Sequence, residues 1–184
     1  MSTSVLTRLG GLTGMLAGLM WCVGYAGMAE LLLPAIGQLG GHVILGLAGL
    51  LTLLALVGML VWDGGRSSWL GTAGYALSLP GATVFSIGNL AEGLWLLEFG
   101  TRLFAVGMMA LIASALLLGF GLLRARVLPP WSVWPLIVGW VAFLPLANVS
   151  AVTGFVPSLL AAFMLGAGWV TLGYALWSGK GTPG

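Results

Sequence analysis

The sequence predicts an all-α, polytopic membrane protein with six transmembrane helices in antiparallel hairpins and both termini in the cytoplasm. Three observations predict this fold class. Of the 184 residues, 60% are hydrophobic and only 5% are charged, whereas roughly 25% of residues in soluble domains are charged. The mean hydropathy is +1.13. The apolar residues form long runs with short polar or turn-forming segments between them, and the basic residues gather at one end of these runs.

The positions of the spans follow from the polar residues that separate the apolar runs. A helix that rises ~1.5 Å per residue needs about 20 residues to cross a hydrocarbon core of about 30 Å. The connections are short, so consecutive helices are expected to lie side by side and antiparallel. The chain therefore reads as a single transmembrane domain over 1–184, with spans at about 9–30, 42–62, 69–97, 103–123, 131–149 and 155–177.

The basic residues predict the orientation. One end of the runs carries Arg8, Arg66, Arg124, Arg126 and Lys180. The other end carries Arg102 alone. Because Lys and Arg are enriched in cytoplasmic loops, this asymmetry places both termini in the cytoplasm. Tryptophans near the same end fit an interfacial aromatic belt, namely Trp62, Trp69, Trp131, Trp134 and Trp177.

A stripe of small residues, spaced four apart, runs along the span at 9–30 and leads to the carboxylate of Glu30. Its members are Gly10, Gly14, Gly18, Cys22 and Ala26. Small residues at this spacing let two helix backbones approach closely, so the stripe is a candidate packing surface. Two interpretations stay open: the stripe packs against a helix of the same chain, or it docks onto a partner subunit.

The span at 69–97 carries a polar face. At ~100° per residue, Ser78, Ser86, Asn89 and Glu92 fall within about one third of the helix circumference. Polar side chains that face lipid cost free energy, so we expect this face to look into the protein or into a water-filled cavity. The candidate residues for contact with a ligand or partner are therefore Glu30, Ser86, Asn89 and Glu92.

His42 is the only histidine and Cys22 the only cysteine. In one interpretation His42 is an axial ligand of a haem or a chlorophyll-type pigment, or a proton-responsive group at the outer surface. In the other it is hydrogen-bonded to a carbonyl or to Glu30. These residues are too few for a zinc site, so no metal site and no particular cofactor is predicted. No nucleophile, acid–base pair or phosphate-binding motif is placed for catalysis, and ten charged side chains are too few to bind nucleic acid.

Two resemblances add to this picture. The turn from Arg124 to Trp131, which reads RARVLPPW between glycine- and leucine-rich spans, resembles poorly characterised bacterial six-helix integral membrane proteins over the last third of the chain. The architecture is also similar to the S-components of energy-coupling-factor transporters, in which a small-residue stripe docks on the coupling subunit and a solute binds from outside. That resemblance implies docking through Gly10, Gly14 and Gly18, and a pocket at Asn89 and Glu92.

Short loops, few ionisable groups and small-residue faces favour a non-catalytic integral membrane protein of the bacterial cytoplasmic membrane. We expect an accessory or assembly subunit of a larger membrane complex, with lipid and other membrane subunits as partners and no enzyme activity. One alternative is a small-solute-binding transporter component with an outward-facing pocket around Asn89, Glu92 and Glu30. The other is a pigment- or haem-carrying subunit that uses His42.

The orientation predicts the accessibility of the segment at 63–69. In a Ser67→Cys variant that also carries Cys22→Ala, an impermeant thiol reagent should label the protein only after the membrane is opened, because this segment is expected in the cytoplasm. The measurement is labelling of intact cells against inverted vesicles. Labelling in intact cells would reverse the predicted orientation.

Overall fold

A computed structural model of the chain describes residues 3–28, 37–95, 98–126, 128–153 and 156–179. Within these residues the structure is all-α, as predicted, with six helices and no strand. Each expected span corresponds to one helix. The helices are α1 (Thr3–Met28), α2 (Gly37–Asp63), α3 (Trp69–Trp95), α4 (Glu98–Ala125), α5 (Pro130–Thr153) and α6 (Val156–Trp177).

Four of the described helices are long and apolar enough to cross a membrane, which indicates a membrane protein. The qualifying segments lie in α1, α2, α4 and α6, at Ser4–Met28, Leu39–Asp63, Phe99–Ala125 and Leu159–Trp177. The described part of α5 contributes a shorter apolar stretch, Pro130–Phe143. The remaining helix, α3, has Pro80 inside it and carries the polar face.

Several helices extend beyond the predicted spans. The segment at 37–41 was expected in a connection but forms the first turn of α2, and the segment at 98–102 forms the first turn of α4. Pro135 and Pro145 lie inside α5 without ending it. The spans were bounded at polar and glycine residues, whereas backbone hydrogen bonding continues through such residues where a neighbouring helix supports them. His42 and Thr101 therefore lie on helices, near the starts of α2 and α4.

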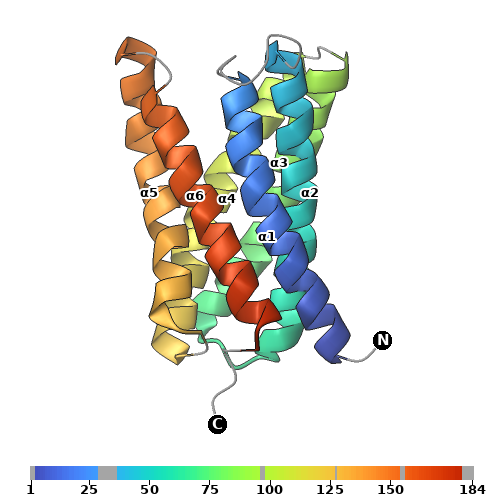
Figure 1. Cartoon of the computed structure of the whole chain (residues 1–184), viewed down its shortest axis with the longest axis vertical. Helices are drawn as coiled ribbons and strands as arrows, with labels where there is room; N and C mark the ends of the chain where they lie inside the picture. Colours follow the sequence, from blue (N-terminus) through green and yellow to red (C-terminus); the bar gives the residue numbers. More distant parts are fainter. Residues whose placement is uncertain (1–2, 29–36, 96–97, 127, 154–155, 180–184) are drawn as a thin grey trace.

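The six helices form a closed ring. Each helix packs against its neighbours in sequence, and α6 packs against α1 to close the ring (Figure 1). The α3–α4 and α1–α2 pairs have the most extensive contacts, and the α4–α5 pair has the sparsest of the neighbouring pairs. The start of α1 and the end of α6 lie at the same end of the bundle (Figure 1). Because α1 packs against both α2 and α6, it lies between them.

The small-residue stripe of α1 faces these two neighbours. A Cβ atom added at Gly10 would lie 2.6 Å from Gly58 Cα in α2. One added at Gly11 would lie 2.6 Å from Gly173 O in α6. Real Cβ atoms do not approach backbone this closely, so the helix backbones themselves are in contact. Further along α1, Gly18 lies against Gly166 O.

The rest of the stripe follows the same course. Cys22 Sγ lies 3.9 Å from Ala162 O in α6, and Ala26 is buried. The stripe therefore lies inside the bundle against helices of its own chain, rather than on an exposed surface that a partner subunit could reach.

Aromatic rings fill the centre of the ring of helices. Trp21 of α1 is fully buried. It stacks on Phe85 of α3, with ring centroids 4.8 Å apart, and meets the edge of Trp140 of α5 at 5.5 Å. Its indole nitrogen donates a hydrogen bond of 3.2 Å to Thr52 Oγ1 of α2. One residue thus joins four helices, and its only polar group is paired.

Two neighbouring glycines of the stripe, Gly14 and Gly18, are predicted to differ in their tolerance of a methyl group. Gly18→Ala should lower the free energy of unfolding by about 1–3 kcal/mol, because its Cβ would meet Gly166 O and force α1 from α6. Gly14→Ala is the matched control, since its Cβ would lie 3.4 Å from Gly173 Cα, an ordinary contact. Unfolding in detergent, followed by circular dichroism, measures both. Equal losses in the two variants would contradict this packing.

Candidate functional site

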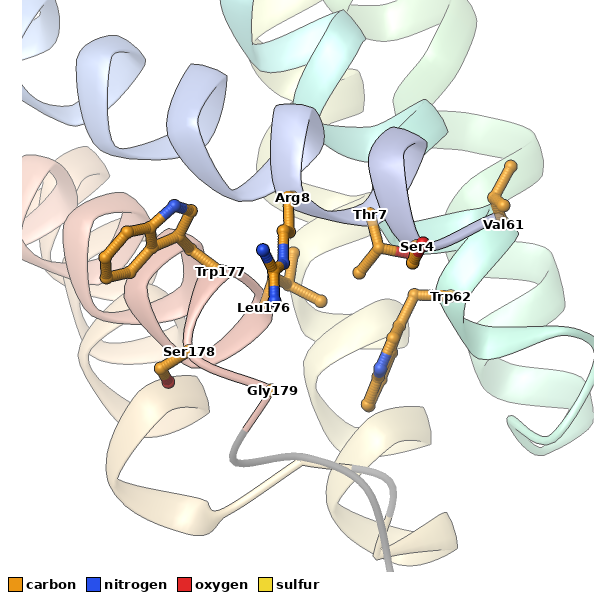
Figure 2. A pocket seen from close by; sticks show the side chains of 9 residues that line it. All are labelled: Ser4, Thr7, Arg8, Val61, Trp62, Leu176, Trp177, Ser178 and Gly179. Atoms are coloured by element: carbon orange, nitrogen blue, oxygen red, sulfur yellow. The ribbon is translucent and has the colours of Figure 1, made fainter. Parts of the chain in front are cut away.

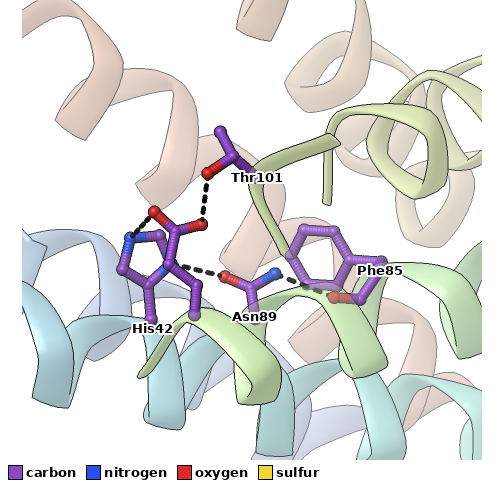
Figure 3. A network of polar contacts seen from close by, with 5 residues as sticks. His42, Phe85, Asn89 and Thr101 are labelled. Carbon is purple, nitrogen blue, oxygen red and sulfur yellow. Dashed lines mark hydrogen bonds and ion pairs between the residues drawn. The ribbon is translucent and has the colours of Figure 1, made fainter. Parts of the chain in front are cut away.

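The polar face of α3 joins α2 and α4 through a network centred on Asn89 (Figure 3). Asn89 is fully buried. Its amide nitrogen donates to Phe85 O at 2.9 Å, so its oxygen Oδ1 is the atom that faces His42 Nδ1, at 3.0 Å. An amide oxygen can only accept, so Nδ1 of His42 carries the proton of this hydrogen bond. Asn89 thereby selects the tautomer of His42.

The other ring nitrogen of His42 faces a carboxylate. Nε2 lies 3.6 Å from Glu92 Oε1, which is an ion-pair distance and longer than a hydrogen bond. His42 therefore links Asn89 and Glu92 of α3, one through each ring nitrogen.

A hydroxyl from α4 completes the network. Thr101 Oγ1 donates to Glu92 Oε2 at 3.1 Å, so each oxygen of the carboxylate has its own partner. The ring of Phe104, also from α4, meets the His42 ring edge to face with centroids 6.3 Å apart. The side chain of Glu92 is 25% exposed and that of His42 is 11% exposed. The network is therefore closed around Asn89 and open to its surroundings at Glu92.

Glycines bring these three helices close enough for short side chains to meet. A Cβ at Gly88 of α3 would lie 2.8 Å from Gly100 O of α4. A Cβ at Gly93 of α3 would lie 2.9 Å from Val43 N of α2. These contacts lie on either side of Asn89 along α3, and the second involves the residue after His42. The backbone therefore sets the separation across which His42, Asn89, Glu92 and Thr101 meet.

The structure brings together only some of the predicted site residues. Asn89, Glu92 and His42 meet, whereas Ser86 is buried but donates to Ala82 O of its own helix at 2.7 Å. Glu30, the carboxylate expected beside His42, lies outside the described residues. Among the described residues, the partners of His42 are Asn89 and Glu92 of α3.

Sequence analysis missed Thr101 and the pairing of His42 with Asn89. Thr101 was assigned to a connection, although it lies in the first turn of α4. The pairing of His42 with Asn89 could have been predicted from the sequence. His42 precedes Asp63 by as many residues as Asn89 follows Ser68, so an antiparallel pair of helices joined by this short turn places the two opposite each other.

The turn between α2 and α3 is formed by its own contacts. Gly64 and Gly65 have φ of 57° and 82°, the region that favours glycine. The buried carboxylate of Asp63 accepts hydrogen bonds from Ser67 Oγ at 2.7 Å and Ser67 N at 3.2 Å, through Oδ2. Arg66 donates to the carbonyls of Asp63 and Trp62 at the end of α2. As predicted, this segment is a turn between two helices, and its charged groups serve to hold it.

A cavity of about 460 Å³ lies at the end of the bundle where α1 begins (Figure 2). It shares no residue with the network of His42 and Asn89. Its lining comes from the start of α1 and the ends of α2 and α6: Ser4, Thr7, Arg8, Val61, Trp62, Leu176, Trp177, Ser178 and Gly179. No sequence motif pointed to this cavity, because its residues come from three distant segments.

Within the described residues, no group of three or more His, Cys, Asp or Glu side chains converges to hold a metal ion. Comparison of the chain with protein-family models, with curated proteins and with solved structures finds no match. The site must therefore be interpreted from its own geometry.

The network predicts unequal roles for two polar residues of α3. Asn89→Leu should lower the free energy of unfolding by about 1–3 kcal/mol, because it leaves His42 Nδ1 buried without an acceptor. Ser86→Ala is the matched control and should cost less than about 0.5 kcal/mol, since Ser86 only bonds to its own helix. Thermal unfolding in detergent measures both. A loss for Asn89→Leu no larger than for the control would show that the network adds nothing to the fold.

Proposed function

We propose that all six helices cross the bilayer as antiparallel hairpins, with both termini in the cytoplasm of a bacterial cell. The lengths of α3 and α5, 27 and 24 residues, support six crossings, since about 20 residues suffice. Each of the two packs against helices that are apolar enough to span. The gathering of Arg8, Arg66 and Arg124 at one end of the chain's hairpins supports the orientation.

Within that membrane, the chain acts as a non-catalytic accessory or assembly subunit of a larger complex. The observation that carries this proposal is the internal use of the polar groups in the helices. His42, Asn89 and Glu92 contact one another, and Ser78, Ser86 and Ser114 donate to carbonyls of their own helices. A catalytic site needs polar groups that are free to meet a substrate.

The exposed surface of the helices is apolar and suits contact with lipid or with other membrane helices. On α4, Val106 is 63% exposed and Met109 is 54% exposed; on α6, Leu160 is 57% exposed. Helix association in a bilayer depends on van der Waals packing and hydrogen bonds rather than on removal of apolar surface from water. With His42, Asn89 and Glu92 engaged in contacts inside the chain, its apolar exposed faces offer their shape to a partner, which is the role of an assembly subunit.

The same contacts disfavour the two alternatives. A pigment ligand would bind through Nε2 of His42, because Nδ1 is bonded to Asn89, but Nε2 faces the Glu92 carboxylate at 3.6 Å. A solute-binding component needs an open pocket at the polar face of α3, whereas Asn89 on that face is fully buried and hydrogen-bonded to His42. The pigment alternative would give a visible absorption band, and the solute-binding alternative would give a bound small molecule.

Native mass spectrometry of gently solubilised membranes tests the proposal. We expect this chain to appear in assemblies with other membrane proteins, because its exposed helix faces are apolar and the His42, Asn89 and Glu92 side chains are engaged within the chain. The Asn89→Leu variant is the control, and its assemblies should keep the same small-molecule content. A chain that always appears alone would contradict a subunit role. A small molecule that is lost with Asn89→Leu, or a visible absorption band, would replace the proposal with the solute-binding or the pigment alternative.

A further inference from the structure

We infer that the cavity at the start of α1 binds a phosphate group, carried by the head group of an anionic phospholipid. The cavity is half open and measures about 460 Å³, which lies within the usual range of roughly 300–1,000 Å³ for small-molecule sites. Figure 2 shows Arg8 directed between the ends of α2 and α6, with Trp62 and Trp177 on opposite sides of it. The lipid part of the inference depends on the membrane location proposed above.

Arg8 supplies the positive charge. Its guanidinium is always protonated and presents a planar set of N–H donors that matches a phosphate. Among the described residues, no ion pair joins Arg8 to a carboxylate. Asp63 directly follows the cavity residue Trp62 in the sequence. Its carboxylate is buried and accepts hydrogen bonds from Ser67. The charge of Arg8 is thus not neutralised by a described carboxylate.

Arg66 adds a second positive charge at the α2 end of the cavity. The end of α2 would present carbonyl oxygens, but Arg66 donates to the carbonyls of Trp62 and Asp63. The guanidinium of Arg66 also lies 4.6 Å from the Trp62 ring centroid. The positive charge of Arg66 therefore covers the α2 carbonyls that would otherwise repel a phosphate.

Apolar surface continues from the cavity along α1. Leu12, Leu16 and Leu19 are each between 44% and 57% exposed. At ~100° per residue they lie within about 80° of Arg8 around the helix. A phosphate at Arg8 and acyl chains along these leucines match the two parts of a phospholipid. Indole rings such as those of Trp62 and Trp177 are favoured at the membrane–water interface, where a head group lies.

The test uses the purified full-length protein and two lipids that differ in head-group charge. Native mass spectrometry should show tighter binding of phosphatidylglycerol than of phosphatidylcholine from detergent micelles that contain each lipid. Arg8→Gln should weaken phosphatidylglycerol binding by about tenfold, the effect of one charge-assisted contact. Arg8 is exposed, so this change leaves the helix packing intact. Arg124→Gln and Arg102→Gln, both at exposed arginines of α4, are the matched controls and should bind as the parent does.

Each other outcome has one meaning. Competition by inorganic phosphate at millimolar concentration, lost in Arg8→Gln, would keep the phosphate site but replace the lipid by a soluble phosphate compound. Equal weakening in Arg8→Gln and Arg124→Gln would overturn the inference, because it would show attraction to surface charge alone. Equal binding of the two lipids would also overturn it. Alkaline carbonate extraction of membranes from cells that express the protein tests the membrane location separately. A failure of the phosphate site is therefore distinguished from a failure of the proposed membrane location.

Discussion

The structure depends on direct contact between helix backbones at glycine. Between helices in a bilayer, removal of apolar surface from water contributes little, because lipid tails are as apolar as the side chains they would replace. Attraction then comes from van der Waals contact, which falls steeply with distance. Gly10 against Gly58 and Gly11 against Gly173 bring α1 into contact with α2 and α6 at their backbones. With α1 held in this way, Trp21 reaches the centre of the ring, where it meets Phe85 and Trp140.

The same constraint determines where polar groups can interact. An asparagine side chain spans a short distance, so its hydrogen bond to a neighbouring helix requires closely spaced backbones. Gly88 and Gly93 provide that spacing toward α4 and α2 on the two sides of Asn89. The hydrogen bond from Asn89 to Phe85 O then orients the amide, and the amide orients His42. The close packing of the helices brings these side chains together. Without the hydrogen bonds between them, their buried donors would be unpaired.

The composition and the apolar runs predicted the helices, because a run of hydrophobic residues longer than about 20 has few other structures in lipid. The inward direction of the α3 polar face was also predictable, since Ser78, Ser86 and Asn89 share one side of a helix and all are buried. The partners of that face were not, because they depend on the register between helices, and register is fixed by glycine contacts distant in sequence. The position of Thr101 was missed for a local reason: polarity was taken as the end of a helix, whereas α4 begins at Glu98.

The two ends of the bundle differ in how readily their polar groups could bind another molecule. At the end that holds Asn89, donors and acceptors are matched to one another, so a ligand would have to break existing bonds before forming its own. At the end that holds Arg8, the charge lies in a cavity bordered by indole rings and helix ends, and a ligand would gain contacts without displacing an ion pair described there. Glu92 is the exception at the first end, because its carboxylate is partly exposed while it faces His42.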